Sequence, residues 1–194
     1  RSAAADTHTT PTGWTPLLLN DVSDPSDDIS SLWYRQADGT EGATVTVSCT
    51  DTRRFVSLSW RITGHVNPAT QAPEVATATG SGTTPDPPTL TPTGGAKDYL
   101  WLALAGRQDR HTVSSYPTSY TLNQISAINT GSGAGNCGTA GAGQQLNAAS
   151  ENPGSFTFSG TESWLAITVA VHPPAVGGAF TAWLMHHRRR HGVA

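Results

Sequence analysis

The stretch FTFSGTESWLAITVAVHPP, residues 156–174, decides the fold class. From Leu165 to Val171 every second residue is aliphatic, which is the period of a β-strand, so these side chains form one continuous apolar face. The opposite face, from Trp164 to His172, carries Trp, Ala, Thr, Ala and His, which is too apolar for ordinary exposure to water and too small to fill a second core. We therefore expect the first face to lie in a core and the second to be covered.

The segment KDYLWLALAG, residues 97–106, repeats this pattern. Its leucines form one face, and Tyr99, Trp101 and two alanines form the other. If the two segments are central neighbours in one sheet, their second faces align into a shallow apolar floor of Trp and Ala side chains. We expect such a sheet.

The composition of the chain favours many short strands. The 194 residues include 20 Gly and 13 Pro, and only 13% are charged. Short alternating runs recur between turn-forming residues, and no helical period occurs before residue 178. The sequence therefore predicts an all-β fold, an antiparallel β-sandwich of the jelly-roll type with about eight or nine strands.

The chain divides into three parts, namely an extended lead-in at residues 1–13, a β-sandwich domain at 14–174, and a linker with a basic helix or tail at 175–194. Within the domain, residues 31–37 and 43–50 predict a hairpin around the turn ADGTEG. The proline-rich residues 65–95 show no sustained period and predict a long functional loop or an extension along the surface.

Two other segments have a clear pattern. Residues 54–64, RFVSLSWRITG, alternate so that Val56, Leu58, Trp60 and Ile62 form the inward face. The glycine-rich residues 125–150 predict a hairpin or a loop.

The C-terminal residues AFTAWLMHHRRRHGVA favour an amphipathic helix. The spacing i, i+3, i+4 and i+7 is followed by Phe180, Trp183, Leu184 and His187. The arginines lie near the C-terminal end of the predicted helix, where the helix dipole favours cations. A helix of about three turns is marginal alone and must dock to persist. We expect this helix, or a neighbouring subunit, to cover the floor; the alternative is a frayed tail.

These expectations define a candidate protein interface. It contains apolar floor residues and the apolar and basic residues of the tail: Trp101, Ala103, Trp164, Ala166, Phe180, Trp183, Leu184, Arg188, Arg189 and Arg190.

No catalytic motif is present. The run GSGAGNCGTAGAG lacks the Lys-Ser or Lys-Thr of a phosphate-binding loop, and the G-x-S-x-G spacing of a nucleophile elbow is absent. The four glutamates lie in or beside turns, so no pair suggests glycoside hydrolysis. We expect no catalytic residues, no cofactor and no enzyme activity; a hydrolase would need a cleft that brings a histidine or paired carboxylates together.

Metal sites are not expected either. The acidic turn with Asp21, Asp24, Asp27 and Asp28 has the carboxylates of a calcium site but not the glycine and closing glutamate of a helix-loop-helix one, and turn capping explains the same residues. The histidines His8, His65, His111 and His172 share no spacing, so only the fold could assemble a histidine metal site. Cys49 and Cys137 match no zinc spacing and leave two alternatives, a disulfide or two separate thiols.

Charge and hydropathy limit the classes of partner. Lys97 is the only lysine, and three arginines gather in the tail with His186, His187 and His191 without interleaved aromatic residues, so we expect no nucleic-acid partner. No apolar run approaches the 18 or more residues of a membrane span, so we expect no membrane partner.

Several motifs resemble a known group of proteins. They are PDPP-x-LTP at residues 85–92 followed by LWLALAG at 100–106, YPTSY at 116–120, and the ending ASENPG-FTFS-ESW-AITVAV within 149–171. Together they resemble uncharacterised proteins of tailed bacteriophages and environmental viral sequences, which look like virion structural proteins with jelly-roll domains of the decoration or fibre type. The resemblance covers roughly residues 12–174 and implies no catalytic residues.

This resemblance implies a non-enzymatic virion protein on the particle exterior, a homo-oligomer that also binds capsid or other virion proteins. The alternative is a carbohydrate-binding β-sandwich module, because exposed aromatic rings stack on sugars. The aromatic candidates for that role are Trp33, Tyr34, Trp101, Tyr116 and Tyr120.

Overall fold

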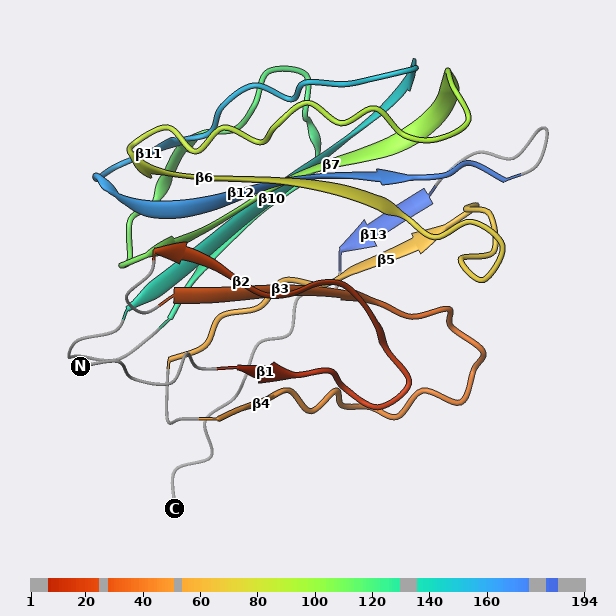
Figure 1. Ribbon diagram of the computed structural model, residues 1–194, viewed down its shortest axis with the longest axis horizontal. Coiled ribbons are helices and arrows are strands. Elements are labelled where there is room, and N and C mark those ends of the chain that lie inside the picture. The colour runs from red at the N-terminus through yellow and green to blue at the C-terminus, as the bar shows by residue number, and fades with distance from the viewer. Residues whose placement is uncertain (1–6, 25–27, 51–53, 130–135, 175–180, 185–194) are drawn as a thin grey trace.

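The computed structural model describes residues 7–24, 28–50, 54–129, 136–174 and 181–184. These residues form strands and no helix, and every pairing is antiparallel, which confirms the prediction of an antiparallel all-β fold (Figure 1). The strands are β1 (His8–Thr9), β2 (Thr15–Asp24), β3 (Asp28–Tyr34), β4 (Ser48–Cys49), β5 (Trp60–Thr63), β6 (Glu74–Gly82), β7 (Lys97–Gln108), β8 (Val113–Ser115), β9 (Leu122–Ile128), β10 (Cys137–Ala148), β11 (Thr157–Phe158), β12 (Glu162–Val171) and β13 (Thr181–Leu184).

A five-stranded sheet in the order β6-β12-β7-β10-β9 forms the centre of the molecule. The two segments with Trp and Ala faces are neighbours in it, as predicted, with Ala166 opposite Ala105 and Ala170 opposite Trp101. The other pairs, β1-β4, β2-β3, β5-β13 and β8-β11, are two-stranded sheets around this centre.

The aliphatic face of the central sheet forms one core. It consists of Leu100, Leu102, Leu104, Leu165, Ile167, Val169 and Val171, all at most 7% exposed. Partly buried residues of β2, β3 and β5, among them Leu18, Leu32 and Trp60, pack against it. Gly141 on β10 makes room for one of them, since a Cβ there would lie 2.6 Å from the Trp60 ring. These strand pairs therefore form a second layer below the sheet in Figure 1.

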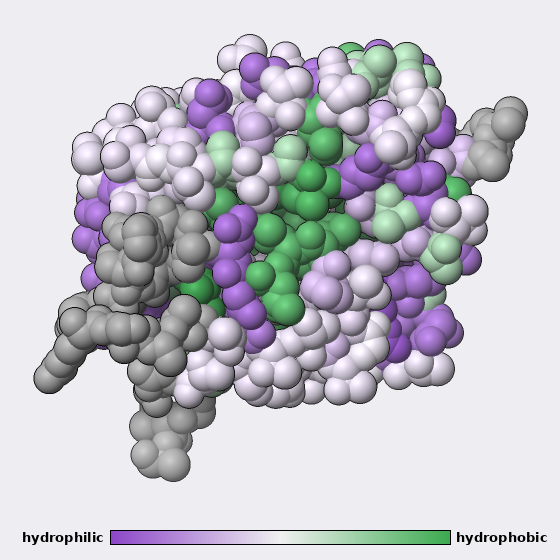
Figure 2. Space-filling model, in the orientation of Figure 1, coloured by the Kyte–Doolittle hydropathy of each residue, from purple (hydrophilic) through white to green (hydrophobic). Residues whose placement is uncertain are grey.

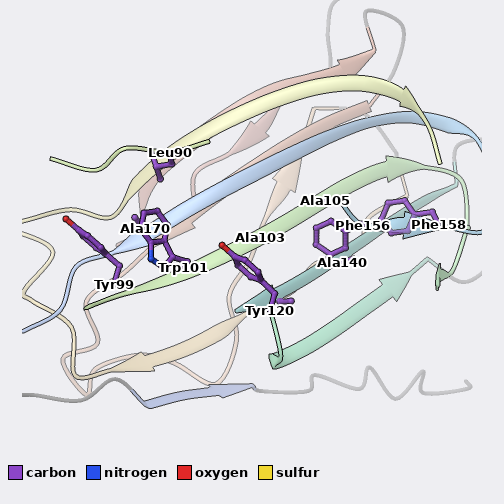
Figure 3. Close-up of a cluster of buried hydrophobic side chains, with 11 residues drawn as sticks. Leu90, Tyr99, Trp101, Ala103, Ala105, Tyr120, Ala140, Phe156, Phe158 and Ala170 are labelled. Atoms are coloured by element: carbon purple, nitrogen blue, oxygen red, sulfur yellow. The ribbon is translucent and has the colours of Figure 1, made fainter. Parts of the chain in front are cut away.

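The Trp and Ala face forms a second core, which is aromatic (Figure 3). Tyr99, Trp101, Tyr120, Phe156 and Phe158 pack there with the alanines of β7, β10 and β12. The indole nitrogen of Trp101 donates a hydrogen bond to the carbonyl of Leu146 at 3.1 Å. Both faces of the central sheet are thus packed.

Among the described residues, the cover of this aromatic core comes from the chain itself. The proline-rich strap, residues 83–92, runs across the sheet with Pro85 and Pro87 fully buried. The backbone of Phe156 donates a hydrogen bond to the Pro85 carbonyl at 2.9 Å, and the Thr168 hydroxyl donates one to the Pro88 carbonyl at 2.6 Å. The strap is therefore fixed to the sheet.

Two segment predictions were wrong. Residues 65–95 are not one loop, because Glu74–Gly82 form strand β6, which pairs with β12 along nine residues. The expected hairpin of 31–37 with 43–50 does not form, because β3 pairs with β2 and only Ser48–Cys49 of the second segment is a strand, paired with His8–Thr9.

Other segment predictions have clear outcomes. Residues 54–63 alternate between half-buried and exposed with Val56 and Ile62 on the inward side, as predicted. The glycine-rich segment forms the hairpin strands β9 and β10. Residues 181–184 form β13 instead of a helix, and the rest of the predicted helix lies outside the described residues. No disulfide joins Cys49 and Cys137.

Candidate functional site

The predicted interface residues fall into three groups. Trp101, Ala103 and Ala166 are fully buried under the chain's own segments, so the floor that they form is closed to a partner. Trp164 is half-buried, with its indole nitrogen buried and without a hydrogen-bond partner among the described residues. Trp183 and Leu184 belong to β13, and Phe180, Arg188, Arg189 and Arg190 lie outside the described residues.

The region that lacks a core of its own is the N-terminal layer, which we define as the described residues 7–63. Every buried hydrophobic residue of the described chain lies between Leu90 and Val171. In the N-terminal layer only Pro11 is buried among the side chains that the structure describes. Its large apolar residues are therefore half-buried or exposed.

Three of these apolar side chains are open to water. Leu19 is 44% exposed, Val45 55% and Phe55 45%. Two other exposed apolar residues, Leu122 and Ile128, lie on the edge strand β9 of the central sheet. Sequence reasoning did not find this surface, because Leu19 lies in β2 whereas Val45 and Phe55 lie outside the strands, so no single strand pattern joins the three residues.

Polar and ring contacts hold the N-terminal layer together in place of a core. The backbone amide of His8 donates to the Asn20 side chain at 2.6 Å, and the indole nitrogen of Trp33 donates to the Thr10 hydroxyl at 3.3 Å. The His8 ring contacts Phe55 edge-on, with centroids 5.7 Å apart. Such contacts fix the layer but bury little apolar area.

An apolar area also reaches the surface near the middle of the face drawn in Figure 1. Figure 2 shows hydrophobic residues gathered there, in the region where β6 and β12 approach the second layer, with hydrophilic residues around them. The aliphatic core and its partly buried members, such as Leu18 and Val75, lie between these layers. On this face, the apolar residues between the central sheet and the second layer are thus not completely covered by other side chains.

A hollow of about 240 Å³ lies in the N-terminal layer. Trp14, Arg35, Glu41 and Val45 are among the residues that line it. The backbone amides of the turn at residues 38–39 donate hydrogen bonds to the Glu41 carboxylate, which keeps the pKa of Glu41 below its usual value. This hollow combines an aromatic ring with fixed charges.

A second, more open hollow of about 400 Å³ lies beside β10. Gln144, Glu151, Asn152 and Ser155 contribute to its polar lining, which contains no aromatic residue. Burial raises the pKa of the Glu151 carboxyl. The predicted sugar-stacking rings do not line it, since Trp101 and Tyr120 are fully buried and Trp33, Tyr34 and Tyr116 are half-buried elsewhere.

Buried ionisable side chains occur at two places at the central sheet. His172 is 2% exposed and its Nε2 lies 2.8 Å from Glu74 Oε1, while Glu74 also accepts hydrogen bonds from the amide and hydroxyl of Thr93. The Arg107 guanidinium lies 3.9 Å over the Phe158 ring, and desolvation lowers its pKa to about 10. Among the described residues, no hydroxyl or thiol lies at hydrogen-bond distance of the His172 imidazole.

The fold brings Asp109, His111 and Glu162 together, with one donor atom of each within 4.8 Å of the others. Apart from the spacing of Asp109 and His111, no sequence pattern predicts this cluster, because Glu162 lies 51 positions beyond His111. The acidic turn at residues 21–28, in contrast, lies partly outside the described residues.

Comparisons with protein-family models, with curated proteins and with solved structures return no match. Among the described residues, no helix is long and apolar enough to cross a membrane.

Proposed function

We propose that this chain is a non-enzymatic structural protein of a tailed-bacteriophage virion, of the head-decoration or fibre type, that assembles on the particle exterior through its N-terminal layer. Its partners are copies of itself and capsid or other virion proteins. The observation that carries this proposal is the contrast in burial: the central sheet is packed on both faces, whereas Pro11 is the only buried side chain among those described in the N-terminal layer.

Covering this layer would contribute part of the free energy of assembly. Full burial of one large aliphatic or aromatic side chain contributes about 1.5–3 kcal/mol. Leu19, Val45 and Phe55 each retain roughly half of their surface, and the half-buried rings beside them add to the area that a partner would cover. Specific interfaces bury on the order of 1,600 Å² in total, and repeated copies on a symmetric shell multiply each contact.

The virion setting is supported by the sequence motifs that resemble phage structural proteins. The segments that carry the resemblance, residues 85–92, 100–106 and 149–171, build the central sheet and its strap. The most specific motifs of the resemblance therefore lie in the central sheet and its strap, although the resemblance as a whole covers roughly residues 12–174.

The experiment compares two sets of substitutions in the full chain. The first, Leu19→Ser with Val45→Thr and Phe55→Ser, removes exposed apolar side chains from the N-terminal layer. The matched control, Leu122→Ser with Ile128→Ser, removes side chains of similar exposure, 41% and 40%, from β9. Light scattering over a range of protein concentrations measures self-assembly, and electron microscopy of purified tailed-phage particles with gold-labelled chain measures attachment.

We expect the unsubstituted chain and the β9 control to assemble or to attach to particles, and the N-terminal variant to stay monomeric and unattached with an unchanged unfolding temperature. A chain that stays monomeric at all concentrations and attaches to no particle would contradict the proposal. So would an N-terminal variant that assembles like the unsubstituted chain.

A second function, glycan binding, is favoured by one observation, the hollow at Trp14. An indole ring, the Arg35 guanidinium and the Glu41 carboxylate share this hollow, and such a combination stacks on a sugar and bonds its hydroxyls. A glycan array probed with the unsubstituted chain and with Trp14→Ala tests it. Binding that is lost in Trp14→Ala supports this function, and an array without any signal removes it.

A further inference from the structure

The side chains of Asp109, His111 and Glu162 converge from three positions on the central region. Asp109 follows the end of β7, His111 precedes β8, and Glu162 is the first residue of β12. Their donor atoms all lie within 4.8 Å of one another, and His111 Nε2 lies 3.5 Å from Glu162 Oε1. All three residues are half-buried, so the cluster is both held by the fold and open to an entering ion.

Neighbouring groups fix two members of the cluster, Asp109 and His111. The Asp109 Oδ1 accepts hydrogen bonds from the Arg110 amide at 2.7 Å and from the Asn136 side chain at 3.1 Å. Asp109 itself has a φ of 59°, which aims its side chain from the end of the strand. The His111 ring lies against Gly160, where a Cβ would be 2.0 Å from the ring, so a larger residue there would displace the ring.

The separation between His111 Nε2 and Glu162 Oε1 is compatible with two ligands of one metal ion. Two ligand atoms at about 2.0–2.2 Å from a tetrahedral Zn²⁺ lie about 3.4 Å apart. The 3.5 Å between His111 and Glu162 matches that edge and is long for a hydrogen bond, whose usual length is about 2.9 Å. An imidazole with two carboxylates is also a donor set suited to divalent transition metals, whose charge the two carboxylates balance.

We propose that Asp109, His111 and Glu162 bind one divalent transition-metal ion of the Zn²⁺ type, with water completing the coordination shell. The bound ion links the connection between β7 and β8 to the start of β12. It therefore acts as a structural clasp at the end of the aromatic core where Phe158 and Arg107 lie. Asn136 is a positioning residue, because it holds the Asp109 carboxylate.

The nearby arginine does not occupy the cluster. The Arg110 guanidinium donates a hydrogen bond to the Asn136 side-chain oxygen at 2.9 Å, on the side of Asn136 that does not hold Asp109. This arrangement orients the amide of Asn136 so that its nitrogen faces the carboxylate.

The test measures Zn²⁺ binding by isothermal titration calorimetry in the full chain. The C-terminal histidines could bind Zn²⁺ themselves, so every protein carries His186→Ala, His187→Ala and His191→Ala. In this background we compare no further change, His111→Ala, Glu162→Gln, and the matched control His65→Ala, which removes a half-buried histidine outside the cluster. Thermal unfolding with and without Zn²⁺ is recorded for each.

We expect one Zn²⁺ per chain in the background protein and in His65→Ala, and a rise in their unfolding temperature with Zn²⁺. Loss of one ligand in His111→Ala or Glu162→Gln should weaken binding by about 100-fold or more and abolish that rise. Asn136→Ala should weaken it by about 10-fold. Co²⁺ should bind with no thiolate charge-transfer band, since no cysteine belongs to the cluster.

The test does not depend on a single variant. If His111→Ala folds poorly, Zn²⁺ binding by the background protein and by Glu162→Gln still decides the outcome. Absence of Zn²⁺, Co²⁺ and Mn²⁺ binding in the background protein would overturn the proposal. Equal binding by the background protein and both ligand variants would also overturn it.

Discussion

The central sheet and the N-terminal layer are built from the same kind of alternating strand, yet only the sheet is closed. In the sheet, both faces of β7 and β12 are buried, one by aliphatic and one by aromatic neighbours. In the N-terminal layer the inward residues reach the aliphatic core, but nothing described covers the outward ones. Alternation therefore specifies a strand, whereas burial depends on whether the chain folds back over both of its faces.

The two regions also differ in the length over which their strands pair. Strands β7 and β10 pair along twelve residues, whereas β1 and β4 pair along two. The sheet is consequently the part that should be the more stable, and the layer, whose inward side covers the aliphatic core, is the part that should gain order from a partner.

The largest difference in unfolding free energy should come from the same substitution, Trp to Ala, made once in the central sheet and once in the N-terminal layer. Trp101→Ala removes a fully buried ring and its hydrogen bond, and should lower the free energy of unfolding by about 3–5 kcal/mol. Trp33→Ala removes a half-buried ring and should cost only about 1 kcal/mol. Urea unfolding measures both, and equal costs would mean that the layer is packed as well as the sheet.

The contact between the regions should be the next most sensitive point. Gly141→Ala places a methyl group 2.6 Å from the Trp60 ring and should cost about 1–3 kcal/mol through displacement of that ring. Gly42→Ala, which meets only a backbone oxygen at 4.0 Å, is the control and should be near neutral. Trp60→Leu should reduce the cost of Gly141→Ala, and a fully additive double variant would show that the ring is not in the way.

A smaller effect, of opposite sign, is expected inside the aromatic core. Arg107 is 4% exposed, and none of its three guanidinium nitrogens has a hydrogen-bond partner among the described residues. Its position over Phe158 contributes about 2 kcal/mol, while burial of an unpaired charge costs several kcal/mol. Arg107→Met should thus be neutral or stabilise by about 1 kcal/mol in urea unfolding, and a loss above 2 kcal/mol would show that the charge has a partner.

The smallest effect concerns acid sensitivity at the edge of the sheet. Burial acts to raise the pKa of Glu74, but hydrogen bonds from Thr93 and His172 outweigh it and the pKa is lowered. A carboxyl with a lowered folded-state pKa contributes stability above its unfolded pKa of about 4.3 and loses it as the pH falls through the folded value. Glu74→Gln should therefore be about 1 kcal/mol less stable at pH 7, with the difference shrinking below pH 4.

Unfolding midpoints from pH 7 to pH 3 measure this difference. A gap between the two proteins that stays constant or widens toward pH 3 would contradict the role of the Glu74 charge.

Strong local patterns predicted the centre of the fold. The neighbouring placement of 97–106 and 162–171 followed from their matching Trp and Ala faces, and the structure confirms it. Strand β6 escaped notice because its alternation is between Thr and Ala, which differ little in hydropathy. The hairpin of 31–37 with 43–50 failed because the partner of β3 is the preceding strand β2, a choice that tertiary packing makes.

The sites could be predicted far less well. The floor of Trp101 and Ala166 was recognised, but its cover is the proline-rich strap, whose side chains show no period that would place it on a sheet. The cluster of His111 and Glu162 arises from the arrangement of β7, β8 and β12 in space, which no local spacing encodes. Open surfaces and clusters depend on pairing, and pairing is the least local property of a β fold.

The most direct test of the central claim is amide hydrogen exchange, followed by mass spectrometry, on the full chain at dilute and at assembling concentrations. We predict that residues 7–63 exchange rapidly in the dilute chain and gain protection on assembly, while β7, β10 and β12 are protected in both states. Protection of residues 7–63 that is equal to that of β7 in the dilute chain, or a gain on assembly confined to β9, would contradict it.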